Sequence, residues 1–292
     1  MDRRKSVLRR ITSAGAAVLA LAFLGVPPAT AAVALPSPKM LTAYLDLECF
    51  KTNSYQPPPT TLMLRHINPV LANLPAEIVT LGPRDQLCVP VAKNDQQPPP
   101  PALDFIRFID LACYRISGSN VGIGLVLGHL NPLFQNFPPT QVSMGGPQQL
   151  CVPVIKNNVV PPADVLALVR HIDLKCYGVF PNTPMGAQIS LRQLNPVLVP
   201  QIPDHPVRIG PARQLCVPVQ KAGDVIPNQI LGIIRWIDLE KFDLDVAATL
   251  QVSLTLRHIN PVLAGLPQEQ AVLTGSGQLA LPVAKNGALP PG

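Results

Sequence analysis

Short stretches in which apolar and polar residues alternate recur along the chain. Between residues 171 and 177, Ile172, Leu174 and Cys176 alternate with less apolar neighbours. A period of two is typical of a strand with one buried face, and it directs this cysteine inward. The apolar run at 165–169 has no clear period, so a short helix stays open there. Similar segments predict further short strands at 62–64, 254–256, 78–81, 207–209 and 271–273, and in the phrase that begins at Gln86.

The residues that interrupt these segments agree with a β protein. Proline accounts for 36 of the 292 residues, and it disfavours long helices because it removes a backbone donor and clashes with the preceding turn. Asn68-Pro69 ends a strand as an Asx-turn followed by a fixed φ. Pro90 lies inside an apolar segment, which predicts an edge strand or a bulge. The pattern therefore predicts an all-β fold of short strands.

Three phrases occur four times in the same order, with consecutive copies of the first phrase 63 to 65 residues apart. Such a period predicts repeated structural units, here 37–98, 99–160, 161–224 and 225–292, joined by proline-rich segments that favour extended spacing. We expect a tandem array of four small β-domains. The first phrase contains Asp46, Asp110, Asp173 and Asp238; the second contains Asn68, Asn131, Asn195 and Asn260; the third begins at Gln86, Gln149, Gln214 and Gln278.

The first 31 residues have the order of a secretory signal peptide. Five basic residues precede Ile11, an uncharged run extends to Val26, and Ala29-Thr30-Ala31 follows. The uncharged run is shorter than the roughly 20 residues of a membrane span; an uncleaved anchor is the alternative. We expect a secreted, bacterial, extracellular protein without a membrane span after cleavage. The formal charge of +6 falls to +2 without 1–31, so nucleic-acid binding is not expected.

Six cysteines in an exported chain predict a disulfide framework. The first three units carry two cysteines each, whereas the fourth unit (225–292) has Lys241 and Ala280 at the two positions. Joint loss is expected when the two cysteines of one unit bond to each other. The alternative, Cys88–Cys113 with Cys151–Cys176, leaves two cysteines without partners. The sequence contains no C-x2-C pair, so a metal site formed by these cysteines is not favoured. We therefore predict Cys49–Cys88, Cys113–Cys151 and Cys176–Cys216.

The remaining recurrent polar positions are interpreted as structural. Each unit has one Asp and one Lys that antiparallel pairing brings together, as with Asp46 and Lys93, and an exposed pair of this kind stabilises only slightly. The alternative is a repeated Ca²⁺ site, but one carboxylate per unit supplies few of the six to eight oxygen ligands that Ca²⁺ takes. A further position holds His66, His129 and His258 but Gln193 in the third unit. This exchange favours hydrogen bonding over acid–base chemistry.

No motif of a catalytic triad, a zinc protease or a phosphate-binding loop is present, and no cofactor is expected. Aromatic residues are sparse, at 4%, which weakens ligand binding by stacking. We expect a structural or ligand-binding protein rather than an enzyme, with an extracellular protein or a glycan as partner. The alternative is an extracellular hydrolase or an inhibitor-like accessory protein with a site between repeats.

Two phrases carry a resemblance to a known group of proteins. Leu87–Asn94 and Asp110–Tyr114 resemble the L-C-x-P-V-x-K-N and D-L-x-C-Y motifs of a family of secreted prokaryotic, Cys-stapled β-repeat domains of unknown function. The resemblance covers the chain after the signal segment and is clearest in the second and third units. The fourth unit departs from it by lacking both cysteines. The resemblance implies secretion and β architecture and assigns no catalytic residue.

Overall fold

The computed structural model describes residues 34–245 and 249–292, and the predicted signal segment at 1–31 lies outside these residues. The described chain is mostly β, as the sequence predicts: 13 strands join one sheet, and four helices of six or seven residues accompany them. Within these residues, no helix has the length and hydropathy needed to cross a membrane.

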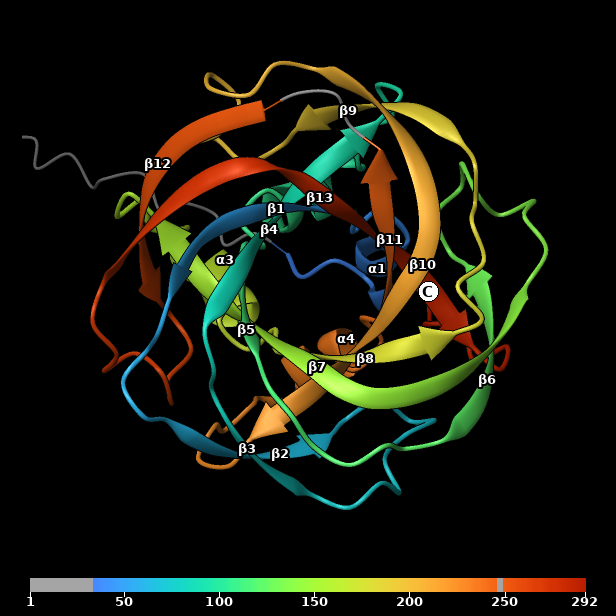
Figure 1. Cartoon of the computed structure of the whole chain (residues 1–292), viewed down its shortest axis with the longest axis horizontal. Helices are drawn as coiled ribbons and strands as arrows, with labels where there is room; N and C mark the ends of the chain where they lie inside the picture. The colour runs from blue at the N-terminus through green and yellow to red at the C-terminus, as the bar shows by residue number, and fades with distance from the viewer. Residues whose placement is uncertain (1–33, 246–248) are drawn as a thin grey trace, which may run out of the picture. The chain divides into compact units, whose positions relative to one another are not determined.

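Eight strands form a closed circuit of antiparallel pairs, which we call the inner ring (Figure 1). Each predicted unit contributes its first and its last strand, and the last strand of the chain pairs with the first one. Near this closure, the Lys39 N–H donates to the Pro291 carbonyl at 3.0 Å. In pairing order the strands are β1 (Leu47–Tyr55), β4 (Arg84–Lys93), β5 (Leu111–Arg115), β7 (Thr140–Lys156), β8 (Leu174–Phe180), β10 (His205–Lys221), β11 (Leu239–Asp245) and β13 (Glu269–Lys285).

Five further strands lie outside the inner ring. They are β2 (Thr61–His66), β3 (Glu77–Thr80), β6 (Ile123–His129), β9 (Gln188–Gln193) and β12 (Thr249–His258). All of them except β3, which pairs with β2, connect units that are not neighbours in the sequence. Strand β2 pairs with β10 and β9 with β4, while β6 pairs with β13 and β12 with β7. Four separate domains are therefore not confirmed, because each unit hydrogen-bonds to its neighbours and to the unit two places along. Separation would leave those strand edges unpaired.

The last strand of each unit has neither the edge position nor the bulge at its proline that the sequence predicts as alternatives. Strand β7 pairs with β8 as far as Cys151 and with β12 from Val154, and Pro153 lies between these two neighbours. Pro90, Pro218 and Pro282 have corresponding positions. A missing N–H costs no ladder bond at the point where one neighbouring strand replaces another. In units two to four, the expected third and fourth strands are continuous.

Four short helices precede the first strand of each unit: α1 (Pro38–Ala43), α2 (Pro100–Ile106), α3 (Ala163–Val169) and α4 (Asn228–Ile234). Three of them follow a proline at the cap position, whose fixed φ suits a helix start. Their buried apolar faces pack with inward-facing leucines and cysteines of the ring. In Figure 1 helices are visible behind the open centre of the ring. The joints are thus partly helical, whereas the sequence pattern allows a helix only at α3.

Candidate functional site

Three disulfides lie within the inner ring, and each links directly opposed residues of two neighbouring antiparallel strands. They are the pairs that the sequence predicts, Cys49–Cys88, Cys113–Cys151 and Cys176–Cys216. In the fourth unit, Lys241 lies opposite Ala280 in the equivalent register. The sulfur atoms of Cys88, Cys113 and Cys151 gather within 4.8 Å, but each is part of a disulfide. None is a thiolate available to a metal.

The aspartates and asparagines predicted to be structural meet in pairs from different units. The Asn68 amide donates to Asp238 Oδ2 at 2.7 Å and to the Arg235 carbonyl after α4. Its Oδ1 accepts the Val70 N–H in the expected Asx-turn. Lys285 forms an ion pair with the same aspartate. The other sets are Asn131 with Asp46 and Lys93, Asn195 with Asp110 and Lys156, and Asn260 with Asp173 and Lys221.

These Asp–Lys pairs, which the sequence predicts, are buried, so the small stabilisation of an exposed pair does not apply to them. The side chains of Asp238 and Lys285 are 5% and 1% exposed. Burial raises the pKa of Asp238, and the Lys285 ammonium and the Asn68 amide oppose that rise. Because the lysine ammonium already neutralises the carboxylate, the arrangement does not favour the Ca²⁺ alternative. The sets hold each unit to the one before it in the ring.

A second group of sites lies between the outward face of the inner ring and the outer strands, and we call them flank sites. Each combines ring residues beside the cysteine position with residues of the unit two places along. Flank site 1 contains Glu48, Phe50, Gln193 and His205; flank site 2 contains Ala112, Tyr114, His258 and Glu269; flank site 3 contains Lys175, Tyr177, His66 and Glu77; flank site 4 contains Glu240, Phe242, His129 and Thr140.

Of the three histidines at the recurrent position, His66 and His258 have the hydrogen-bonding role that the sequence predicts. His66 Nε2 lies 2.9 Å from Tyr177 Oη, and His258 Nε2 lies 3.0 Å from Tyr114 Oη. His129 instead packs against Phe242, with 6.0 Å between ring centroids. Burial lowers the pKa of all three histidines to about 4. They are therefore neutral at physiological pH.

Flank site 2 has the residue types of an acid–base cluster, but substrate access is closed. The Tyr114 hydroxyl donates to Glu269 Oε1, and Arg84 Nε donates to Glu269 Oε2 at 3.1 Å. Each of these three residues is at most 2% exposed, and His258 is 3% exposed. A buried, hydrogen-bonded cluster of this kind stabilises the fold and offers no surface for a hydrolytic reaction.

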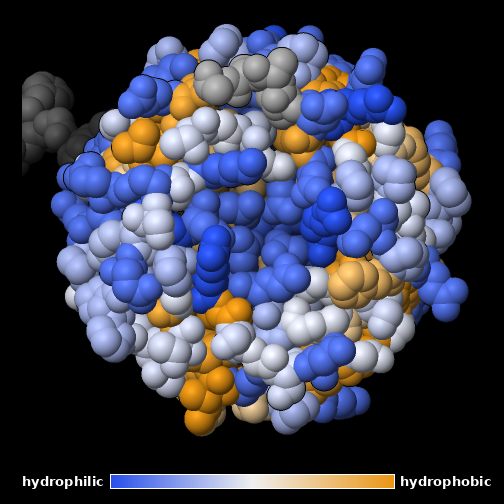
Figure 2. Space-filling view, in the orientation of Figure 1, coloured by the Kyte–Doolittle hydropathy of each residue, from blue (hydrophilic) through white to orange (hydrophobic). Residues whose placement is uncertain are grey.

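The ring end away from the helices is polar, and we call it the mouth. Gln86, Gln149, Gln214 and Gln278 each stand two residues before the cysteine position, so they share its inward face and form the next layer. Figure 2, in the same orientation as Figure 1, shows hydrophilic residues gathered in a hollow at the centre of this face. The repeated glutamine was visible in the sequence, but only ring closure brings the four copies together.

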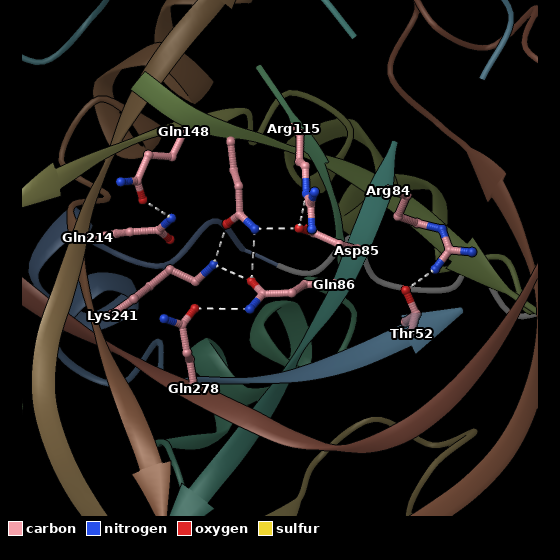
Figure 3. Close-up of polar contacts among 10 residues, drawn as sticks. Thr52, Arg84, Asp85, Gln86, Arg115, Gln148, Gln214, Lys241 and Gln278 are labelled. Atoms are coloured by element: carbon pink, nitrogen blue, oxygen red, sulfur yellow. Dashed lines mark hydrogen bonds and ion pairs between the residues drawn. The ribbon is translucent and has the colours of Figure 1, made fainter. Parts of the chain in front are cut away.

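Lys241 connects this layer (Figure 3). Its Nζ donates to Gln86 Oε1 at 2.7 Å and to Gln149 Oε1 at 2.9 Å. The Gln86 amide donates to Gln278 Oε1 at 3.0 Å, and the Gln214 amide donates to Gln148 Oε1 at 2.6 Å. Burial lowers the pKa of Lys241 to about 7. The residue that replaces a cysteine thus places a buried amine with a lowered pKa below the mouth.

Two exposed ion pairs lie at the rim of the mouth. Arg115 Nε donates to Asp85 Oδ2 at 2.8 Å, and Arg213 Nε donates to Asp243 Oδ2 at 2.6 Å. The second oxygen of Asp85 accepts the Gln149 amide at 3.0 Å, and that of Asp243 accepts the Gln278 amide at 3.2 Å. The mouth therefore presents amide, carboxylate and guanidinium groups from six different ring strands. Such a set is suited to hydrogen-bonding a polar molecule.

Comparisons with protein-family models, with curated proteins and with solved structures found no match to this chain. A functional proposal consequently rests on the residues themselves.

Proposed function

We propose that the protein is a secreted, tandem-repeat ligand-binding protein. In this proposal the mouth binds a polar ligand with hydroxyl or carboxylate groups, such as the end of a glycan. The observation that carries the proposal is the convergence of four glutamines and Lys241 on one hollowed, hydrophilic face of the ring. Amide side chains both donate and accept hydrogen bonds, as recognition of hydroxyl groups requires.

One buried acceptor beneath the mouth lacks a hydrogen-bond donor within the described part of the chain. Gln214 is 6% exposed, and its Oε1 has no hydrogen-bond partner among the residues that the structure describes. A buried acceptor without a donor costs about 1–3 kcal/mol. A ligand whose hydroxyl or amine reached this oxygen would remove this cost. The strands beneath are held by disulfides, so little ordering of the site is required on binding.

The closed ring favours a binding protein over a spacer. A spacer needs its two ends apart, whereas the Lys39 N–H and the Pro291 carbonyl lie 3.0 Å apart. The three disulfides are compatible with an extracellular protein. The resemblance to secreted repeat domains, carried by Leu87–Asn94 and Asp110–Tyr114, supports the same location.

The test is a glycan-array screen with the mature, disulfide-intact protein, followed by calorimetry on each hit. Gln149→Leu removes a mouth residue, and Gln141→Leu on the same strand is the matched control because Gln141 is exposed on an outer part of β7. We expect tenfold or greater loss of affinity for the first variant and none for the second. Equal affinities of the two variants would place the ligand elsewhere. If no saccharide bound at millimolar concentration, the proposal that the ligand is a glycan would be refuted.

A further inference from the structure

We propose that flank site 4 binds a small organic cation, an ammonium group, through the Glu240 carboxylate. This site is separate from the mouth, and the proposal does not depend on a ligand there. It rests on a comparison of the four flank sites, whose positions correspond but whose charges differ.

In flank sites 1 to 3, each carboxylate has a cationic partner within the protein. Glu48 Oε1 lies 2.9 Å from His205 Nε2, and this hydrogen bond is the main reason that the pKa of His205 rises to about 9. In flank site 3 the charges are exchanged, because Lys175 forms an ion pair with Glu77. In flank site 2, Glu269 pairs with Arg84.

Flank site 4 has the carboxylate without the cation. Glu240 is 2% exposed, and it has no ion pair or hydrogen bond among the described residues. Thr140 stands where flank site 1 has His205 and cannot carry charge. His129, the other titratable residue of the site, is neutral because burial and the nearby Lys93 lower its pKa to about 4. A buried carboxylate without a partner is costly in its ionised form, so a cation from outside would complete the site.

The space beside Glu240 suits an ammonium group. A pocket of about 130 Å³ is lined by Glu240, His129, Thr140, Phe137, Phe242 and Met185, among others. Aromatic faces attract a cation, and most strongly where water is displaced. Phe137 is 38% exposed, so the lining extends to the protein surface. The volume holds a group of a few non-hydrogen atoms, since a water molecule occupies roughly 30 Å³ in the liquid.

A metal ion fits the site less well than an organic cation. The pocket offers one carboxylate, one neutral imidazole and one hydroxyl, whereas Ca²⁺ takes six to eight oxygen ligands. The surrounding residues are apolar and aromatic, which suits the alkyl surface of a substituted ammonium. Burial also raises the pKa of Glu240 to about 7. A proton consequently competes with the cation at neutral pH.

The experiment measures binding of choline to the mature protein by calorimetry and by NMR shifts of the Phe137 and Phe242 rings. The control ligand is 3,3-dimethylbutan-1-ol, which has the same shape without the charge. We expect choline to bind and the neutral isostere to bind at least tenfold more weakly. Affinity should rise between about pH 6 and pH 8 as Glu240 ionises. Equal affinities of the two ligands, or no binding of choline at millimolar concentration, would overturn the proposal.

Three variants locate the effect. Glu240→Gln should reduce choline affinity at least tenfold, while Glu48→Gln at the corresponding position of flank site 1 should leave it unchanged. Thr140→His supplies the cation that flank site 1 has, and it should also reduce choline affinity. Retained binding in both Glu240→Gln and Thr140→His would refute the assignment even if one of them folded poorly. Gln149→Leu in the mouth should bind choline normally, which separates this test from that of the glycan site.

Discussion

Restoring the missing fourth disulfide tests whether the inner ring is one closed structure. In the variant Lys241→Cys with Ala280→Cys, the new cysteines are directly opposed on β11 and β13, as Cys113 and Cys151 are on β5 and β7. The three natural disulfides have Cα–Cα distances of 3.8 to 3.9 Å. We expect the fourth bond to form spontaneously during oxidative folding because the register already presents this geometry.

The gain in stability follows from two opposing effects. Closing a loop of about 40 residues stabilises by roughly 4 kcal/mol on the chain-entropy model. The new loop does not overlap the three natural ones, so their contributions should be independent. Loss of Lys241 removes the donor to Gln149 Oε1, which costs about 1–3 kcal/mol. The expected net gain is about 2 kcal/mol, or about 4–8 °C in the thermal midpoint for a domain of this size.

The assay combines intact mass, thiol titration and thermal unfolding under oxidising conditions. The matched control is Lys241→Ser with Ala280→Ser, which loses the same lysine without forming a bond. The bonded variant should have no free thiols and a higher midpoint than this control. Persistent free thiols, or exchange with natural cysteines, would contradict the register of β11 and β13. A bonded variant with the midpoint of the control would refute the loop-entropy reasoning.

Three further predictions concern burial, titration and ring assembly. Lys285→Met should lower the free energy of unfolding, measured by urea denaturation, by about 3–5 kcal/mol because it leaves the buried Asp238 carboxylate without its cation. Adding Asp238→Leu to this variant should recover part of that loss. Equal stability of Lys285→Met and wild type would show that the pair is not buried as described. The pKa of His205 is raised to about 9 from an ordinary 6.5, so this residue contributes stability below about pH 6.5 that is lost as pH rises towards 9. His205→Asn should therefore flatten the fall in unfolding free energy between these two pH values. An unchanged pH profile in this variant would contradict the pairing of His205 with Glu48. Residues 99–160 alone should lack dispersed amide signals in NMR, because β6 and β7 need β13 and β12; a folded spectrum would support independent domains after all.

Much of the local structure was determined by the sequence alone. The period of two around Leu174 and Cys176 placed the cysteines on an inward face, and the absence of Cys at Lys241 and Ala280 indicated the pairing. The Asn-Pro turns were equally local, because an Asx-turn needs only the asparagine side chain and the backbone two residues on. These features depend on residues that are near in sequence or related by the repeat, so they can be predicted from the sequence alone.

The tertiary structure decided what the repeats do together. Four similar units are compatible with a string of domains or with a closed ring, and the units have the same hydrophobic pattern in either case. The closed ring is stabilised by long-range pairing of strands, such as β1 with β13 and β2 with β10. This pairing hydrogen-bonds the backbone groups of strand edges that a separate unit would expose. Only this pairing buries the Asp–Lys–Asn sets, gathers four glutamines around Lys241, and leaves Glu240 without the cation that the related sites contain.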